Sequence, residues 1–530
     1  MNISDTTMDD GELLGEISSV TSGGMKVRLH REATQDIHLA ASSRIGQIIK
    51  TPVEDAWVFA TIRSMATGHD NSVELVVEYN GQSQGGKFNR GVTYYPFPGA
   101  SVYQATKANL TEVFAPQRSE SIRIGTVVPT DDIGASLLIE PFLSKHFAIL
   151  GSTGTGKSCT VALTIHSIVN QLPNAHIVVL DPHNEYADAF PENGVHFNTE
   201  NLDLPYWLMN LDEHYELFIS KESDGRDAQQ DVLKRCLLEA RKKSHTGIYK
   251  SRITVDTPVP YKISDMMAAL DAEGGKLDKA EDAKPFMKLR AKYEELRSDQ
   301  RYAFMFSGLL VQDSLASVLS RILRFPVSGR PISTLDLSGV PSDIVDVVVA
   351  LLSRLVFDYS MVSHKASEAR PVLLVAEEAH RYVPNSGRDS RGSARRQLEQ
   401  IAKEGRKYGV SLGLVSQRPS DISESVLSQC GTIITMRMNN ERDRNYVEKA
   451  LPEGSAAFLD ALPALQNREC IVSGEGTSAP VRVKLDYLDE NLRPKSDDPE
   501  FSAGWADDID INNEIVKQTI NNWRWGKKTS

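Results

Sequence analysis

The stretch LGSTGTGKS at Leu150–Ser158 fills the G-x-x-x-x-G-K-[ST] pattern of a phosphate-binding loop. Its glycines let backbone N–H groups face phosphate oxygens, and a following helix adds the positive end of its dipole. Lys157 is expected to reach the β and γ phosphates, and the Ser158 hydroxyl to bind Mg²⁺. A ligand-free glycine turn is disfavoured, because an apolar run precedes the loop and a mostly apolar helix follows it. The residues expected to hold the nucleotide are Gly151, Ser152, Thr153, Gly154, Thr155, Gly156, Lys157, Ser158 and Cys159.

Carboxylates end two later apolar runs, Ala175–Leu180 and Pro371–Ala376. Apolar strands that alternate with helices indicate a parallel sheet, where ligands lie at the carboxyl ends of strands. Glu377 is expected to hold Mg²⁺ through water, and Glu378 to orient or deprotonate the attacking water. Asp181 is placed to meet Mg²⁺ or its waters, although a turn or helix-cap aspartate explains it equally well.

Two further polar features follow the second carboxylate strand. Gln417, at the tip of the expected strand Val410–Val415, suits a sensor of the γ phosphate. A Gly/Ser-rich loop is expected to carry four arginines opposed only by Asp389, so its guanidinium groups could track a phosphate backbone. A plain solvated loop is the alternative. The four arginines are Arg388, Arg391, Arg395 and Arg396.

The surrounding segments change character along the chain. Residues 11–115 contain short β-like segments separated by glycines, which predicts a small barrel or sandwich that serves assembly or docking. Residues 206–305 repeat apolar positions at helical spacing and predict a helical insertion within the sheet domain. The tail from residue 486 is acidic and polar but holds Trp505, Trp523 and Trp525, which suggests docking on a neighbour, with disorder as the alternative.

The composition limits the possible classes of protein. A chain of 530 residues is too long for one ordinary core and predicts two or three domains. Its net charge of -12 argues against binding nucleic acid over its whole surface, so any DNA contact must be local. The start of the chain lacks signal-peptide features, and the apolar run Ile344–Phe357 is too short and too charged to span a bilayer. The four widely spaced cysteines favour a reducing cytosol over a zinc or disulfide framework.

Taken in order, these motifs resemble the HerA branch of the HerA/FtsK superfamily of ring-forming, RecA-like DNA-translocating ATPases. The resemblance is carried by HFAILGSTGTGKS, LDPHNEY, LLVAEEAH, EGRKYG and LVSQRPSDI, and by RGVTYYPFPG in a region similar to the family's HAS-barrel. It implies an α/β fold: a RecA-like P-loop NTPase core with an amino-terminal small β-barrel and a helical insertion. The expected parts are a barrel (1–118), a first ATPase part (119–205), the insertion (206–305), a second ATPase part (306–485) and an acidic tail that packs on a neighbouring subunit (486–530).

The resemblance also implies a function. It predicts a cytoplasmic homo-hexamer, without membrane contact, that threads double-stranded DNA and hydrolyses ATP with Mg²⁺ at subunit interfaces. Arg406 falls where the family pattern has an arginine that acts on the neighbouring site, with Arg418 and Arg437 as substitutes and a helix salt bridge as its competing role. Glu377 stands where many P-loop enzymes have Asp, and its longer side chain can still reach Mg²⁺ through water. The expected catalytic set is Lys157, Glu378, Arg406 and Gln417.

Relatives in this family act with a nuclease in DNA end processing, or with a nuclease or NADase effector in antiphage defence, so a partner is expected to dock on the barrel. Two other functions stay open. The ring could be an ATP-regulated scaffold that assembles and activates an effector without processive translocation. A conjugation-type or secretion motor at a membrane is the third, and the absence of a spanning segment in the sequence counts against it.

Overall fold

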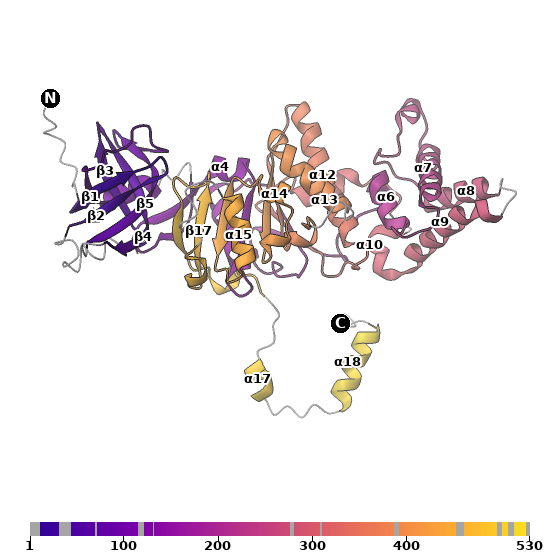
Figure 1. Ribbon diagram of the computed structural model, residues 1–530. Helices are drawn as coiled ribbons and strands as arrows, with labels where there is room; N and C mark the ends of the chain where they lie inside the picture. Colours follow the sequence, from indigo (N-terminus) through magenta and orange to yellow (C-terminus); the bar gives the residue numbers. More distant parts are fainter. Residues whose placement is uncertain are drawn as a thin grey trace. The chain divides into compact units, whose positions relative to one another are not determined.

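The computed structural model divides into two compact units, Met1–Pro494 and Lys495–Ser530. The first unit contains a β-barrel, a large mixed sheet and a set of helices (Figure 1). The described residues are 11–30, 44–68, 72–114, 121–130, 132–275, 280–307, 310–385, 392–451, 460–495, 501–506 and 513–525.

Six strands near the amino terminus close into a barrel, because β2 pairs with both β1 and β5. Alternate side chains point inward, so that Leu14, Val27 and Ile49 are fully buried. Closure removes the free edges that an open sheet would expose. The strands are β1 (Leu13–Val20), β2 (Gly24–Leu29), β3 (Ile48–Val53), β4 (Ala56–Thr67), β5 (Val73–Gln84) and β7 (Ser101–Gln104), and β6 (Lys87–Arg90) pairs with β5 outside the closed ring.

The large sheet has eleven strands in the order β12-β13-β11-β14-β15-β10-β16-β17-β18-β8-β9. The first seven are parallel, as the sequence predicted, and the last four continue the sheet antiparallel to their neighbours. The strands are β8 (Ser121–Val127), β9 (Gly134–Leu138), β10 (Phe147–Leu150), β11 (Ile177–Asp181), β12 (Gly194–Phe197), β13 (Ile332–Asp336), β14 (Val372–Ala376), β15 (Val410–Ser416), β16 (Thr432–Met436), β17 (Glu469–Gly474) and β18 (Val481–Leu485).

Both faces of the parallel part are buried. In β10, Phe147 and Ile149 belong to one hydrophobic core, and Ala148 and Leu150 belong to the other. Helix α5 (Lys157–Gln171) contributes to the first core, and α12 (Val345–Lys365) contributes to the second. This burial explains why the strands are continuous apolar runs without alternation.

Helices fill the chain between β12 and β13, as predicted. They pack on the same core as α12, with Leu233, Leu237 and Leu289 among the fully buried side chains. This set comprises α6 (Leu211–Phe218), α7 (Arg226–Lys243), α8 (Ile263–Gly274), α9 (Ala280–Ser298), α10 (Ala303–Phe306) and α11 (Leu315–Leu323). The barrel, the α/β sheet and this helical insertion confirm the predicted fold class.

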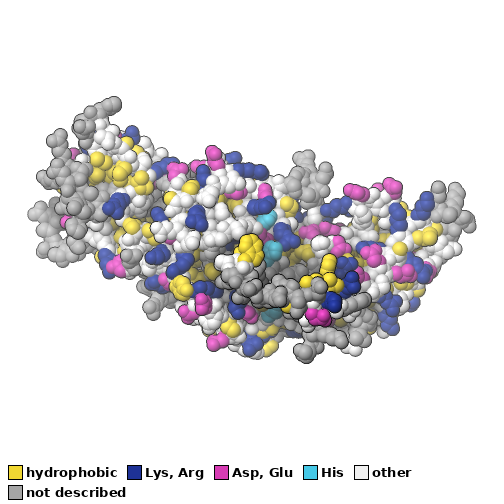
Figure 2. All heavy atoms as spheres, turned by 90° about the horizontal axis from the view of Figure 1, so that it is seen from below, with side chains coloured by type: hydrophobic (Ala, Val, Ile, Leu, Met, Phe, Trp, Pro, Cys, Tyr) yellow, Lys and Arg dark blue, Asp and Glu magenta, His cyan; other side chains and the backbone are white. Residues whose placement is uncertain are grey.

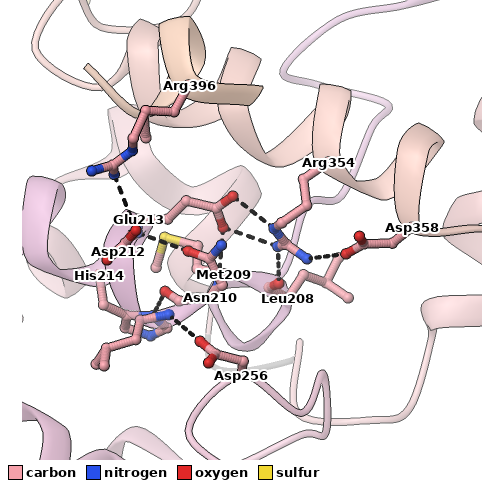
Figure 3. A network of polar contacts seen from close by, with 12 residues as sticks. Leu208, Met209, Asn210, Asp212, Glu213, His214, Asp256, Arg354, Asp358 and Arg396 are labelled. Carbon is pink, nitrogen blue, oxygen red and sulfur yellow. Dashed lines mark hydrogen bonds and ion pairs between the residues drawn. The ribbon is translucent and has the colours of Figure 1, made fainter. Parts of the chain in front are cut away.

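A buried ion pair ties the insertion to α12. Arg354 of α12 donates from Nε and Nη2 to the two carboxylate oxygens of Glu213, at 2.8 and 2.9 Å (Figure 3). The same guanidinium also donates to the Leu208 carbonyl at 2.6 Å and to Asp358 at 3.2 Å. Glu213 itself closes a capping box with Asn210 at the start of α6. The first turn of α6 is therefore held against α12 by charged hydrogen bonds between the buried side chains of Arg354 and Glu213.

The apolar run Ile344–Phe357 lies in α12 and at its start, within the core of the sheet domain. In the described part of the chain, no helix has the length and apolar character needed to cross a membrane. The second unit contains α17 (Phe501–Ala506) and α18 (Asn513–Trp525), with Trp505 and Trp523 more than four-fifths exposed. Docking of this tail on a neighbouring subunit stays a prediction.

Candidate active site

The predicted phosphate loop connects β10 to α5, whose first residue is Lys157. Gly154 and Gly156 have φ values of 75° and 95°, a region that favours glycine. A Cβ on Gly151 would lie 2.8 Å from the Cβ of Met436, so this position also needs glycine. The pattern of glycines therefore follows from the backbone path, and it leaves the loop N–H groups at the start of a fifteen-residue helix.

Lys157 lies among carboxylates in a nearly buried position, with 8% of its surface exposed. Its Nζ donates to the Ser152 carbonyl at 3.2 Å. Burial lowers the pKa of Lys157, and the charges of Glu377, Glu378 and Glu185 act in the opposite direction. The ammonium thus links the loop electrostatically to the acidic side of the site.

Glu185 is a site residue that the sequence argument did not single out. The Ser158 hydroxyl donates to its Oε2 at 2.5 Å. Glu185 follows β11 in the LDPHNEY segment, directly after Asn184, whose φ is 57°. The signal available in the sequence was that this carboxylate, like Asp181, stands just past the carboxyl end of a buried strand.

Asp181 is completely buried, and its carboxylate is occupied by the turn that follows it. Its Oδ1 accepts from the His183 N–H at 3.2 Å, and its Oδ2 accepts from the Tyr186 N–H at 2.9 Å. Burial raises the pKa of Asp181, and these backbone hydrogen bonds act against the rise. The contacts match the turn-aspartate alternative, and its assignment to Mg²⁺ stays a prediction.

One carboxylate oxygen of Glu377 is buried without a hydrogen-bond partner among the described residues. Its Oε1 accepts from the Tyr186 hydroxyl at 3.2 Å, whereas Oε2 has no hydrogen-bond partner among the described residues. Burial and the nearby charges of Glu185 and Glu378 raise its pKa well above the usual range, and Lys157 acts against them. A buried carboxylate oxygen of this kind is stabilised by a cation, so the donor set of Ser158, Glu185 and Glu377 fits Mg²⁺.

Glu378, two residues after the end of β14, has a left-handed backbone with a φ of 51°. Its Oε2 lies 3.4 Å from Gln417 Nε2 and 3.1 Å from His380 Nδ1. The Thr153 hydroxyl in turn donates to the Gln417 side chain. A non-glycine residue in this conformation is held by its surroundings, and such strain concentrates at functional sites. Gln417 therefore bridges the phosphate loop and the carboxylate expected to act on water.

The three candidate arginines lie at different places. Arg406 is exposed just before β15, whereas Gln417 follows that strand. The length of the strand therefore separates them by about 20 Å. Arg406 lines a mainly apolar cavity of about 1000 Å³ at the amino ends of the strands. Arg418 lies beside Gln417, and the Arg437 carbonyl accepts from the Ser152 N–H at 3.1 Å. Within its own chain, Arg406 is not part of the site around Lys157.

The proposed DNA-contacting segment differs from its prediction in one respect. Arg395 and Arg396 lie in helix α13 (Ser393–Glu404), not in a loop, because the apolar positions of this segment pack on the core at helical spacing. Arg395 pairs with Glu399 at 2.9 Å. Arg396 pairs with Asp212 at 3.3 Å (Figure 3). Arg388 and Arg391 lie outside the described residues. Figure 2 shows Lys and Arg side chains interspersed with Asp and Glu over one face.

Comparison with known proteins adds an independent observation. A model of the central domain of the helicase HerA matches residues 122–356. The chain is 26% identical to the DNA double-strand break repair helicase HerA of Pyrococcus furiosus, over 80% of this chain and 79% of that protein. It is 28% identical to a probable helicase of Methanocaldococcus jannaschii, over 80% of this chain and 77% of that protein.

Solved structures with a similar fold include VirB4 of Thermoanaerobacter pseudethanolicus, at 16% identity and a TM-score of 0.49. That alignment covers 71% of this chain and 99% of the other. The bacterial conjugative coupling protein TrwB aligns at 13% identity with a TM-score of 0.46, over 71% of this chain and 91% of the other.

Proposed function

Because this chain is similar to HerA helicases over about four-fifths of its length, we propose that it is an ATPase that couples ATP hydrolysis to movement along double-stranded DNA. The observation that carries the proposal is the cluster around the phosphate loop. Lys157, Glu377, Glu378 and Gln417 come from three strand ends, yet they are linked by hydrogen bonds and short-range charge. Ser158 joins them through its hydrogen bond to Glu185. These are the groups that phosphoryl transfer to water requires.

Each residue has a distinct role in the proposed reaction. The loop N–H groups and Lys157 bind and orient the phosphates, and Lys157 offsets the negative charge that grows on the γ phosphate. Ser158, positioned by Glu185, and Glu377 would hold Mg²⁺, which neutralises charge on the phosphate oxygens. Glu378 accepts the proton of the attacking water. Gln417, which contacts both Glu378 and Thr153 of the loop, senses the γ phosphate.

The proposed assembly is a homo-hexamer in which Arg406 serves the site of the adjacent subunit. Its exposure and its distance from the Lys157 site of its own chain support a role between subunits. An arginine beside the transferred phosphate stabilises the charge that develops there. Arg418 and Arg437 are the alternatives within this proposal.

Double-stranded DNA is the proposed track, bound by the arginine segment inside the ring. The net charge of -12 and the mixed surface charge favour a local contact over a basic outer surface. Replacing Arg388 and Arg391 by Ala should weaken DNA binding and lower the slope of log Kd against log salt by about one for each phosphate that these arginines neutralise. If this variant binds DNA like the wild type across a salt titration, the segment does not contact DNA. Arg290→Ala, on the exposed side of α9, is the matched control.

A partner effector, a nuclease or an NADase, is proposed to dock on the barrel in DNA end processing or antiphage defence. The RGVTYYPFPG segment supports this, because Tyr94, Tyr95 and Phe97 are 56, 43 and 80% exposed. The second candidate function, an ATP-regulated scaffold that activates this effector, rests on the same surface. It predicts that effector activity survives Glu378→Gln as long as ATP still binds. A cytoplasmic location is part of the proposal.

The test of the ATPase mechanism is Glu378→Gln, which keeps the size of the side chain but removes the base. It should lower steady-state hydrolysis by about 100-fold or more while ATP binding and native mass stay unchanged. Glu368→Gln, at an exposed position before β14, is the control and should hydrolyse ATP like the wild type. A Glu378→Gln protein with wild-type turnover would contradict the proposed role of Glu378.

A further inference from the structure

An exposed aromatic side chain is flanked by two guanidinium groups near the phosphate loop. Tyr487 is 63% exposed. The guanidinium carbons of Arg493 and Arg468 lie 4.1 and 5.0 Å from the centroid of its ring. Planar groups arranged in this way present faces on which another planar, electron-rich ring can stack.

Strand directions locate this cluster at the edge of the sheet that carries the phosphate loop. β16 runs parallel to β10, and β17 and β18 each reverse direction, so β18 ends at the same edge as β10. Tyr487 follows β18, and Arg468 precedes β17 with a left-handed φ of 67°. The Arg468 side chain is fixed there by donation from Nη2 to the Leu485 carbonyl at 2.7 Å.

The segment after Tyr487 then passes along α5. Leu488, directly after Tyr487, packs against the hydrophobic core that contains Val161 and Ile165 of α5. Arg493 is also anchored by donation from Nε to the Leu488 carbonyl at 2.6 Å. The cluster therefore lies on the side of the sheet that α5 covers.

The cluster and the catalytic carboxylates lie on opposite sides of the loop. Glu377 and Glu378 follow β14, two strands from β10 in one direction. Tyr487 follows β18, three strands from β10 in the other direction, which is roughly 14 Å at the usual strand spacing. Since the γ phosphate must face the carboxylates, the nucleoside end of the ligand extends away from them, toward the cluster.

We propose that Tyr487, with Arg468 and Arg493, forms the subsite for the nucleobase of the bound nucleotide. This inference rests on the proposed function, because it needs phosphates on the loop of Gly151–Ser158. The base stacks on the exposed ring or on a guanidinium face. Tyr487 does not contact the phosphates. Glu490, the nearby carboxylate, also disfavours a phosphate at this position.

The experiment compares a ligand that has a base with one that lacks it. Binding of ADP and of inorganic pyrophosphate, both with Mg²⁺, is measured by calorimetry on the full chain. Tyr487→Ala should raise the Kd for ADP about 5- to 100-fold, because the stacking of one base on an aromatic ring changes the affinity by about this factor. The Kd for pyrophosphate, which has no base, should stay unchanged. Tyr487→Phe should stay within about twofold of the wild type. Tyr249→Ala, at a site 67% exposed in the helical insertion, is the control.

Two results would overturn the subsite. In one, ADP binding is unchanged in Tyr487→Ala; in the other, both ligands weaken equally, which would indicate a purely electrostatic effect. Lys157→Ala separates this failure from failure of the proposed function, because it should weaken both ligands wherever the base lies. A wild-type chain that binds neither ligand would contradict the proposed function itself.

Discussion

The Ser158 hydroxyl and the Glu185 carboxylate share a hydrogen bond of 2.5 Å, although the two residues belong to different motifs. Glu185 also lies close enough to Lys157 and Glu377 to shift their pKa values. The turn after β11 thus positions the hydroxyl that would bind Mg²⁺. The same turn is held in place by Asp181, whose carboxylate accepts its backbone N–H groups.

Replacing Glu185 by Gln should therefore weaken Mg²⁺ use more than it weakens the fold. We expect ATP hydrolysis to fall about 10- to 100-fold, with more Mg²⁺ needed for half-maximal rate, as is usual when a group that orients a metal ligand is removed. The measurement is the hydrolysis rate over a Mg²⁺ titration. Glu192→Gln, at an exposed position on the same connection, serves as the control. An unchanged Mg²⁺ dependence would exclude the positioning role of Glu185.

Arg406 is expected to act on the site of the adjacent subunit. Arg406→Ala should then lower hydrolysis about 1000-fold or more, as loss of an arginine finger does. Arg370→Ala, an exposed position lining the same cavity, should have little effect. Mixing Arg406→Ala with Glu378→Gln chains should restore part of the rate, because some interfaces then combine an intact Arg406 with an intact Glu378. If the two variants exchange subunits and the hydrolysis rate does not recover, Arg406 does not act on the adjacent subunit.

The buried pair of Arg354 and Glu213 should matter for stability, not for chemistry. Arg354→Ala leaves Glu213, which is 1% exposed, without its counter-charge, and such losses cost about 3–5 kcal/mol. We expect a lower midpoint of urea unfolding. Replacing both residues by Met should recover part of the loss, because no buried charge then remains. Arg290→Ala breaks exposed ion pairs and should change the midpoint little. Equal midpoints for Arg354→Ala and Arg290→Ala would contradict this account.

Asp346 should make stability depend on pH. Burial, and then a hydrogen bond with Glu216, raise its pKa from 3.8 to about 7, while the Ala394 N–H and Lys221 act against the rise. The folded chain thus keeps a proton that the unfolded chain releases, so the free energy of unfolding falls as pH increases from about 4 to about 7. Asp346→Asn should flatten this slope in thermal unfolding, whereas Asp203→Asn, an exposed control, should not. If the stability of wild type and of Asp346→Asn changes with pH in parallel, Asp346 does not keep this proton in the folded chain.

Much of the fold was predictable, because the parallel strands are apolar runs buried on both faces and the loop glycines are required by the backbone. The expected strand Val410–Val415 is β15, and the apolar run Pro371–Ala376 contains β14. The strands β17 and β18 were not predicted. Antiparallel edge extension depends on pairing between segments, which no local pattern records.

The site was less predictable, because it depends on which strand ends meet. The strand-end argument pointed to Asp181, yet the turn places Glu185 against Ser158. The arginine segment was interpreted from its Gly and Ser content, but Arg395 and Arg396 lie in α13, whose buried positions Leu398 and Ile401 keep it helical. Tertiary packing decided both cases.

The most direct test of the central claim is the steady-state rate of ATP hydrolysis by the full chain, with and without linear double-stranded DNA. A DNA-translocating ATPase predicts Mg²⁺-dependent hydrolysis that DNA stimulates several-fold, with stimulation abolished in Lys157→Ala. Hydrolysis that ignores DNA at every salt concentration at which DNA binds would contradict translocation and favour the scaffold.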